Sequence, residues 1–324
     1  MKLPSRLLLA LKFLLACGLL HIPPALARQP SQRKASPTQV KGTRVSLTPP
    51  EGFTEATRFS GFQQEETGAS LMVTELPGPY TEVTTGFTAE GLTSRGMKLL
   101  SKKQVKVNGH KGLLLHVAQS ASGVDFLKWL VVLGDASATL VVTATYREED
   151  TKALGRPMQA AVLSTRWDRD AAPTAAPALF TLKETPGLKE AQRLQGAIIY
   201  TRDGTLPGKP GDEPFLIVAP SLGATAASED VEAFSLARLK QTAAAEALTV
   251  ESGAPLTVDG LTGHELVASA KDPATGRDFT LYQVMLVDAQ GYYLLQGRVG
   301  GADRATYLGH FKTAARAFQR TPRP

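Results

Sequence analysis

Hydrophobic residues along the chain form short apolar runs bounded by turn residues, a pattern that predicts β-strands. Apolar residues spaced three or four apart, which predict a helix face, occur in only two places in each half of the sequence. The runs and the helix faces follow the same order in both halves. The pattern therefore predicts two similar α+β units in tandem.

The expected elements of the first half begin with an extended segment at residues 45–47. A strand pair at 58–62 and 70–76 follows, then a helix over 80–100, although Gly86, Gly91 and Gly96 interrupt it. Strands at 126–133 and 139–145 come next. A closing helix carries Leu154, Met158 and Val162.

The second half repeats this order after an extended segment at 180–182. Its strands are expected at 195–200, 215–219, 279–287 and 292–299. Its first helix is expected to begin at the N-cap Ser228, with Glu229 and Asp230 facing the positive helix end. Its closing helix carries Tyr307, Phe311, Ala315 and Phe318.

Two dipeptides mark hairpin turns in equivalent places. Asn108-Gly109 and Asp259-Gly260 are preferred in two-residue hairpins, in which both central residues have positive φ. Strands joined by short hairpins pair antiparallel, so the fold class expected is α+β. Each half is expected to be an α/β sandwich with a mainly antiparallel sheet flanked by helices.

A direct comparison of the halves supports a duplication. Residues 123–166, shifted by 153 without a gap, give nine identities, among them Asp125 with Asp278 and Asp135 with Asp288. The order of predicted elements agrees as well. The expected organisation is a signal peptide at 1–27, a disordered basic leader at 28–43, a first domain at 44–168, an Ala/Pro linker at 169–178, a second domain at 179–320 and a tail at 321–324.

The sequence resembles a known superfamily along these elements. The turn Pro50-Glu51-Gly52-Phe53, the Gly-x-x-Gly hairpin and the final Ser164-Thr165-Arg166-Trp167 are similar to those of the PsbP/DcrB-like superfamily of Mog/PsbP-type α/β sandwiches. The resemblance covers most of the first half, and the second half mainly after Ser228. It implies two tandem copies of a binding or assembly module without catalysis. No matched metal-ligand motif accompanies it.

The N-terminal segment has the three regions of a secretory signal. A positive start precedes a mostly apolar stretch over 7–20, and Ala25-Leu26-Ala27 offers small residues for cleavage. The apolar stretch is too short to span a membrane. Cys17, in Leu14-Leu15-Ala16-Cys17-Gly18, resembles a lipobox cysteine, so a lipoprotein anchored at Cys17 is the alternative to a periplasmic or extracellular protein cleaved after Ala27.

Composition excludes general disorder, since 43% of the residues are hydrophobic and 20% are charged. The net charge of +6 does not mark a nucleic-acid footprint. Seven basic residues precede Arg44, and the rest of the chain holds 29 basic and 30 acidic residues. A domain that binds nucleic acid concentrates basic charge on its folded surface, so no nucleic-acid partner is expected.

No catalytic, cofactor-binding or metal site is predicted. His110, His116, His264 and His310 lack metal-ligand spacing, and cleavage after Ala27 would remove the only cysteine. Of the recurring aspartates, Asp135 and Asp288 lie at hairpin tips, where turn chemistry explains them, and no functional role is expected for Asp125 and Asp278 either. Trp129 and Trp167 are expected in a core or an interface.

The function expected is that of an exported, non-enzymatic envelope protein. It would bind a protein or another envelope component through its sheet edges or the cleft between copies. Two alternatives remain open, a carrier of a small apolar ligand between the copies and an enzyme with an unrecognised site. No cofactor is expected.

Overall fold

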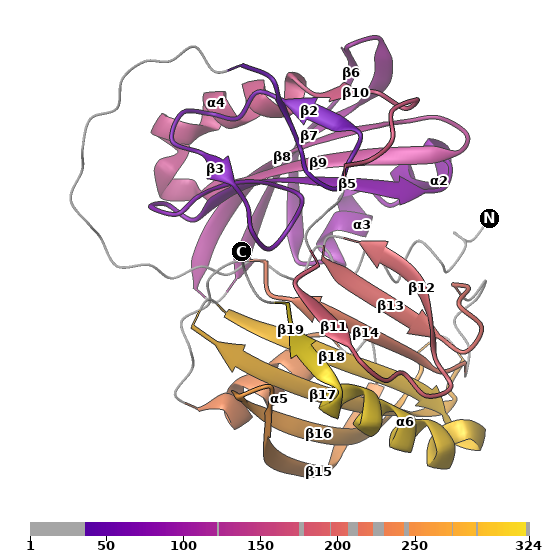
Figure 1. Cartoon of the computed structure of the whole chain (residues 1–324). Coiled ribbons are helices and arrows are strands. Elements are labelled where there is room, and N and C mark those ends of the chain that lie inside the picture. The colour runs from indigo at the N-terminus through magenta and orange to yellow at the C-terminus, as the bar shows by residue number, and fades with distance from the viewer. Residues whose placement is uncertain are drawn as a thin grey trace. The chain divides into compact units, whose positions relative to one another are not determined.

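The structure is a computed structural model that describes residues 36–121, 123–174, 178–194, 196–206, 213–222, 230–242, 246–273, 275–289 and 291–321. The chain divides into two compact units, with the boundary between Pro177 and Ala178. Figure 1 shows that each unit is built around one large twisted sheet. The predicted signal peptide and Cys17 lie outside the described residues.

The sheet of the first unit has seven antiparallel strands, in the order β3-β4-β5-β9-β8-β7-β6. In chain order the strands are β3 (Thr54–Glu55), β4 (Gly61–Gln64), β5 (Ala69–Pro77), β6 (Met97–Val107), β7 (His110–Ala121), β8 (Val124–Gly134) and β9 (Ala138–Arg147). A small separate sheet pairs β1 (Thr38–Gln39), β2 (Val45–Leu47) and β10 (Arg166–Trp167). The helices are α2 (Tyr80–Thr84), α3 (Ala89–Thr93) and α4 (Thr151–Leu163), and the 3-10 turn η1 (Glu148–Asp150) precedes α4.

The sheet of the second unit also has seven antiparallel strands, in the order β12-β13-β14-β18-β17-β16-β15. In chain order the strands are β12 (Lys189–Leu194), β13 (Ala197–Thr201), β14 (Phe215–Pro220), β15 (Glu246–Val258), β16 (Leu261–Lys271), β17 (Asp278–Asp288) and β18 (Gly291–Gly300). β11 (Phe180–Leu182) pairs with β19 (Phe318–Arg320) in a small second sheet. The helices are α5 (Val231–Thr242) and α6 (Arg304–Arg316), with the 3-10 turn η2 (Gly301–Asp303) before α6.

The two large sheets have the same strand order. In each sheet, the third strand in chain order (β5 or β14) pairs with the seventh (β9 or β18). The fourth strand in chain order (β6 or β15) lies at one edge of its sheet. Asn108 and Asp259 have φ of 43° and 51°, and the glycines that follow them also have positive φ. The predicted hairpin turns are therefore confirmed, and they set the register of β6 on β7 and of β15 on β16.

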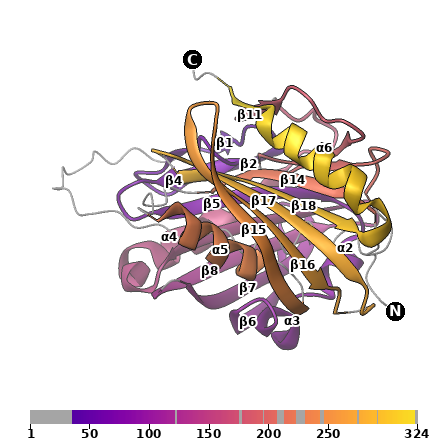
Figure 2. The same ribbon diagram turned by 90° about the horizontal axis from the view of Figure 1, so that it is seen from below.

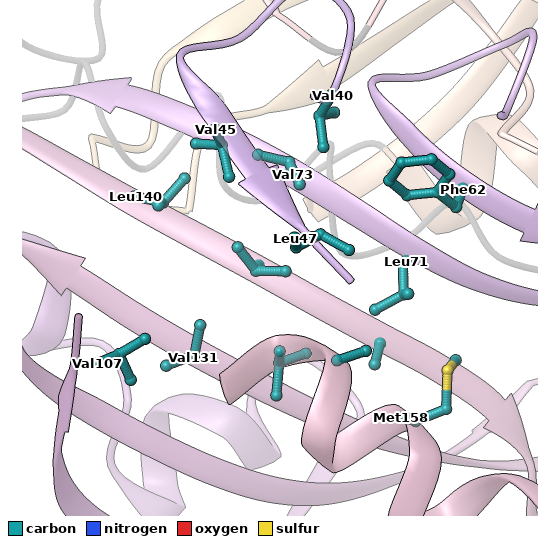
Figure 3. Packing of buried hydrophobic residues seen from close by; sticks show 14 of the residues in the cluster. Val40, Val45, Leu47, Phe62, Leu71, Val73, Val107, Val131, Leu140 and Met158 are labelled. Atoms are coloured by element: carbon teal, nitrogen blue, oxygen red, sulfur yellow. The ribbon is translucent and has the colours of Figure 1, made fainter. Parts of the chain in front are cut away.

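The core of the first unit lies between the large sheet, α4 and the small sheet. Figure 3 shows the side chains of Val45 and Leu47 of β2 in one cluster with Val73 and Leu140 of the large sheet and Met158 of α4. Trp167 belongs to this core and is 6% exposed, whereas Trp129 is partly buried against it. The predicted positions Leu154, Met158 and Val162 do face the sheet from α4.

The second unit has cores on both faces of its sheet. The α6 side buries Tyr307 and Phe311 against the even-numbered residues of β17, such as Tyr282 and Val284. The α5 side buries Leu239 with the odd-numbered residues Phe279 and Leu281 of β17 and with even-numbered residues of β16, such as Leu266. Successive side chains of a strand point to opposite faces, so the two helices cover opposite sides of one sheet. Figure 2 shows α6 lying across β17 and β18.

The predicted helix over residues 80–100 is wrong. Two five-residue helices, α2 and α3, occupy its first part, and Met97 already begins β6. Gly86 separates the helices, and Gly96 has φ of 71°, a conformation that ends helices. The helical cover of the first unit is therefore thinner than expected.

Two further expectations about helices differ in detail. Ser228 lies outside the described residues, and Asp230 instead caps α5, since its Oδ1 accepts a hydrogen bond from the Ala233 N–H at 2.9 Å. Phe318 was expected on the closing helix but lies on β19, because α6 ends at Arg316. The side chain of Phe318 is nevertheless fully buried.

Residues at both boundaries of the first unit contact it. Thr38–Gln39 forms β1 and pairs with β2, and Val40 is 1% exposed. At the other boundary, Thr174 Oγ1 accepts a hydrogen bond from the Gly42 N–H, and Thr174 donates its own N–H to Thr43. These contacts explain why segments of polar composition are ordered against the first unit.

Candidate functional site

Each histidine has contacts of its own, with an aromatic ring or with another neighbouring side chain. The His116 ring stacks on Trp129 with centroids 4.0 Å apart and an interplanar angle of 11°, and burial lowers the pKa of His116. His110 lies 5.8 Å from the Trp167 ring, and His310 lies 5.1 Å from Tyr307. In the part of the chain that the structure describes, no group of three or more His, Cys, Asp or Glu residues could hold a metal ion.

The recurring aspartates next to phenylalanine form cross-strand contacts beside a turn. Asp125 accepts a hydrogen bond from the hydroxyl of Ser120, which it faces across β7 and β8. Asp278 forms an ion pair with Lys271 at 2.7 Å in the equivalent register. These contacts tie the ends of paired strands together, which is a structural role.

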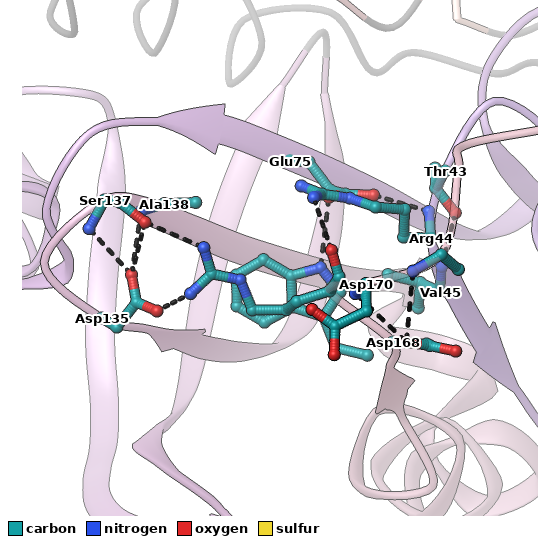
Figure 4. A network of polar contacts seen from close by, with 12 residues as sticks. Thr43, Arg44, Val45, Glu75, Asp135, Ser137, Ala138, Asp168 and Asp170 are labelled. Atoms are coloured by element: carbon teal, nitrogen blue, oxygen red, sulfur yellow. Dashed lines mark hydrogen bonds and ion pairs between the residues drawn. The ribbon is translucent and has the colours of Figure 1, made fainter.

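Asp135 has a larger role than turn chemistry alone predicts. Its Oδ1 accepts hydrogen bonds from the Ser137 and Ala138 N–H groups at 2.8 and 3.1 Å, which shapes the β8–β9 hairpin tip. Its other oxygen forms an ion pair with Arg169, and Arg169 also donates to Ser137 Oγ. Asp135 therefore joins the hairpin tip to the segment that follows β10 (Figure 4).

A network around Glu75 closes the same end of the first unit. The Glu75 carboxylate accepts hydrogen bonds from the Arg44 N–H, from the Arg44 guanidinium at 2.6 and 2.8 Å, and from Trp167 Nε1 at 3.1 Å. The Arg169 guanidinium lies 5.0 Å from the Trp167 ring centroid. Figure 4 shows Arg44 and Glu75 joined at one end of this network, whose other end is Asp135.

The equivalent end of the second unit lacks this network. Strand register places Leu179 at the position of Arg44, Pro220 at that of Glu75, and Arg320 at that of Trp167. The space under the closing strand is filled by three aromatic rings. Their centroids lie 5.6 Å apart for Phe180 and Phe318, and 4.9 Å apart for Tyr293 and Phe318.

One buried cation stands out on the large sheet of the first unit. Lys128 is 7% exposed, and its cross-strand neighbours in register are Val117 and Thr145. Burial lowers the pKa of Lys128 to about 8. The equivalent residue of the second unit is Leu281, which packs in an apolar cluster.

The outer strands β6 and β15 share an unusual feature. Each is the last strand of its sheet, and each is interrupted by a β-bulge, at Leu100 between Leu99 and Ser101 and at Glu251 between Val250 and Ser252. Among the described residues, the large hydrophobic side chains that are exposed are Leu100 at 43% and Val250 at 40%. Both lie at or beside the bulges, so equivalent edges present an apolar side chain to solvent.

The charges of the two edges differ. β6 carries the exposed residues Lys98, Lys102, Lys103 and Lys106, and Lys111 of β7 lies directly opposite Lys106. No acidic residue occurs from Gly91 to Val124. Lys102 Nζ donates to the Phe87 carbonyl at 2.9 Å, and none of these lysines forms an ion pair within the described residues.

This lysine edge is not apparent from the overall composition of the chain. The count of 29 basic and 30 acidic residues from Arg44 onward averages over both units and hides a local run of one sign. The stretch without acids from Gly91 to Val124 was the available signal. The predicted helix over residues 80–100 conceals this signal, because it places residues 97–100 on a helix rather than on an edge strand.

Comparison with known proteins gives distant similarity only. No family model matches the chain, and no curated protein matches its sequence. Within the described residues, no helix is long and apolar enough to cross a membrane.

Three solved structures are similar in fold. Cyanobacterial PsbP (CyanoP) from Synechocystis sp. PCC 6803 shares 14% identity over 44% of this chain and 99% of its own, with a TM-score of 0.31. PA94, a protein of unknown function from Pseudomonas aeruginosa, shares 16% identity over 41% of this chain and 88% of its own, also with a TM-score of 0.31. The T6SS immunity protein TplEi from Pseudomonas aeruginosa shares 14% identity over 89% of this chain and 98% of its own, with a TM-score of 0.32. Likeness at this level does not assign the chain to a family.

Proposed function

We propose that this chain is an exported, non-enzymatic protein of the cell envelope that binds a partner protein through the free edges of its sheets. In this proposal it consists of two diverged copies of a PsbP/DcrB-like unit. The shared strand order of the two sheets and the equivalent turns at Asn108 and Asp259 support the duplication.

One observation carries the binding function. The exposed large hydrophobic side chains of the described residues, Leu100 and Val250, lie on the two equivalent edge strands. An edge strand presents unpaired backbone N–H and C=O groups, which can pair with a strand of another protein. An apolar side chain beside such groups adds surface that a partner would bury.

Site-specific photo-crosslinking tests this function in the full chain. A benzophenone amino acid replaces Leu100 or Val250 in cells of the native host, and the control replaces Arg156, an exposed residue of α4. We expect a discrete crosslinked protein from position 100 or 250 and none from position 156. Crosslinks of equal yield at all three positions, or none at any, would contradict the proposal.

Export is a separate part of the proposal and rests on the segment that ends at Ala27. The intact mass of the protein recovered from the periplasm is expected to match a chain that begins at Arg28. A lipid-modified N-terminus at Cys17 would replace this proposal with the anchored alternative. Retention of residues 1–27 in a cytoplasmic protein would contradict export itself.

A further inference from the structure

We propose that β6 is a docking strand for an extended, acidic segment of a partner protein, which adds to the sheet of the first unit. This inference rests on the proposed binding function and narrows it to one edge and one partner chemistry. Its basis is the lysine edge, defined as Lys98, Lys102, Lys103 and Lys106 of β6 with Lys111 of β7.

The geometry of β6 suits strand addition. β6 is 11 residues long, and only β7 pairs with it, so its outer backbone groups have no neighbouring strand among the described residues. Figure 2 shows β6 at the margin of its sheet, with α3 next to it. An incoming strand would satisfy these backbone groups and contact Leu100, which is 43% exposed.

The lysines flank this edge on both faces of the sheet. Lys98 and Lys103 pair with Ala118 and Leu114, whose side chains belong to the core on the α4 side. Lys102 and Lys106 pair with residues that point to the opposite face. Successive side chains of an added strand point to opposite faces of the sheet, and lysines lie on both faces. This edge therefore favours a partner segment that has acidic residues at neighbouring positions as well as at alternate ones.

One lysine pair is unfavourable without a partner. Lys106 and Lys111 lie directly opposite each other in register, and like charges in this position destabilise a sheet. The equivalent residues of the second unit are Thr257 and Thr262, an uncharged pair. A carboxylate placed between the two ammonium groups would remove the repulsion, so the pair favours an anionic occupant.

A protein segment fits this edge better than a phosphate-rich surface. The edge offers alternating backbone donors and acceptors, and a peptide backbone complements both kinds of group. The phosphate groups of nucleic acids and anionic lipids offer hydrogen-bond acceptors to the lysines but no donors to the strand carbonyls. β6 also contains no arginine, the residue most suited to bidentate phosphate contacts.

Fluorescence anisotropy with a defined probe tests the inference. The probe is a fluorescein-labelled ten-residue peptide of alternating Glu-Glu and Val-Leu pairs, and the proteins are the full chain, the variant K106T/K111T and the control K152T/R156T. The first variant installs the residues of the second unit. The control removes the same charge from the exposed face of α4.

We expect K106T/K111T to weaken binding of the peptide at least tenfold and K152T/R156T to weaken it less than twofold. A peptide N-methylated at every second amide should also bind at least tenfold more weakly, because it cannot form a ladder with β6. Tryptophan fluorescence of both variants is expected to match the parent protein, which verifies their folding.

Three results would overturn the inference. They are equal weakening by the two variants, unchanged binding of the N-methylated peptide, and tighter binding of phosphatidylglycerol vesicles or of an oligothymidylate than of the acidic peptide. The photo-crosslinking test stands apart from these results. If position 100 captures a partner that K106T/K111T still retains, the acidic specificity of β6 is wrong and the binding function remains.

Discussion

The two units close the same corner of one fold with different side chains. In the first unit, Arg44, Glu75 and Trp167 form a hydrogen-bonded, partly buried ion-pair network under the closing strand. In the second unit the equivalent residues are Leu179, Pro220 and Arg320, and Phe180, Tyr293 and Phe318, at the positions of Val45, Leu140 and Thr165, form a cluster of stacked and tilted rings. The strand order is the same in both sheets.

This difference shows what the fold requires at the corner. A short strand must be held against the large sheet, and either aromatic packing or a satisfied polar network can hold it. The two arrangements lose stability for different reasons when one of their side chains is removed. Loss of a ring leaves a cavity, whereas loss of one charged partner leaves the other charge without compensation in a poorly hydrated place.

The largest effect is expected from Phe318→Ala in the second unit. Phe318 is 1% exposed and contacts both Phe180 and Tyr293, so truncation should lower the free energy of unfolding of this unit by about 3–5 kcal/mol. Hydrogen exchange of β11 and β18 amides measures the loss. The control Phe318→Leu keeps most of the volume and should cost less than about 2 kcal/mol. Equal losses for Ala and Leu would mean that ring packing does not hold this corner.

Glu75→Ala tests the polar corner and should destabilise the first unit by about 2–4 kcal/mol. The expected loss is below that for a fully buried pair, because the side chains of Arg44 and Glu75 are 26% and 16% exposed. Both tryptophans of the chain, Trp129 and Trp167, lie in the first unit, so denaturation followed by tryptophan fluorescence reports on it.

The matched control for this change is the double variant Arg44→Leu with Glu75→Leu. It removes both charges and places at residue 44 the leucine that the second unit has at Leu179. Replacing both partners of an ion pair with apolar residues is often nearly neutral, so this variant should recover most of the stability. If the double variant is as unstable as Glu75→Ala, the network does not act as a charge pair.

Much of the fold could be predicted because local signals agree with the common order of elements in the two halves. Asn108-Gly109 and Asp259-Gly260 fix two hairpins, and the apolar runs at 126–133 and 279–287 lie within β8 and β17. The error at residues 80–100 arose where signals conflict. Val83 and Phe87 have helical spacing, but Gly86 and Gly96 end the helices, and the following segment pairs with β7 instead.

Lys128→Leu should stabilise the first unit by about 2–3 kcal/mol at pH 7, since it installs the residue that the second unit has at Leu281. Burial lowers the pKa of Lys128 from 10.5 to about 8, which corresponds to about 3 kcal/mol. Below pH 8, the buried Lys128 ammonium group therefore lowers the free energy of unfolding by this full amount. Between pH 8 and pH 10.5 the Lys128 ammonium group is deprotonated in the folded state but still protonated in the unfolded chain. The free energy of unfolding therefore rises with pH in this range, and the destabilisation by Lys128 disappears.

The measurement is denaturation followed by tryptophan fluorescence at pH 7 and at pH 10. We expect the gain of Lys128→Leu to shrink strongly at the higher pH. The matched control is Lys152→Leu on α4, an exposed position whose substitution should change stability by less than about 0.5 kcal/mol at either pH. A gain that is the same at both pH values would show that desolvation of the ammonium group is not its cause.

The candidate site was less predictable than the fold because it depends on neighbours in space. Lys106 and Lys111 are five residues apart, and only the register across the Asn108-Gly109 turn places them opposite each other. The exposure of Leu100 and Val250 likewise follows from bulges in edge strands, and a bulge has no signal in a single sequence. Glu75 and Arg44 are separated by the three strands β2, β3 and β4, so their pairing could not be predicted from sequence spacing.

The smallest effect is expected from Asp259→Asn, which gives the second unit the turn residue type of Asn108. In the first unit, Asn108 Nδ2 donates to the Thr165 carbonyl at 2.5 Å, and in the second unit Asp259 accepts from the Arg320 N–H and Nε at 3.0 and 2.8 Å. Both contacts tie a hairpin turn to the closing strand. Only the second of them depends on charge.

The hydrogen bonds from Arg320 lower the pKa of Asp259 below its usual range. The stabilisation by this carboxylate is therefore complete above the pKa of the unfolded chain, and it is lost as the pH falls through the lower pKa of the folded state. Because both side chains are partly exposed, Asp259→Asn should cost only about 0.5–1 kcal/mol at pH 7, and the difference from the parent should vanish at acidic pH. Thermal unfolding at pH 7 and at low pH measures both values. A loss that persists unchanged at low pH would mean that the two turns are held by geometry alone, and that the units differ here in residue but not in mechanism.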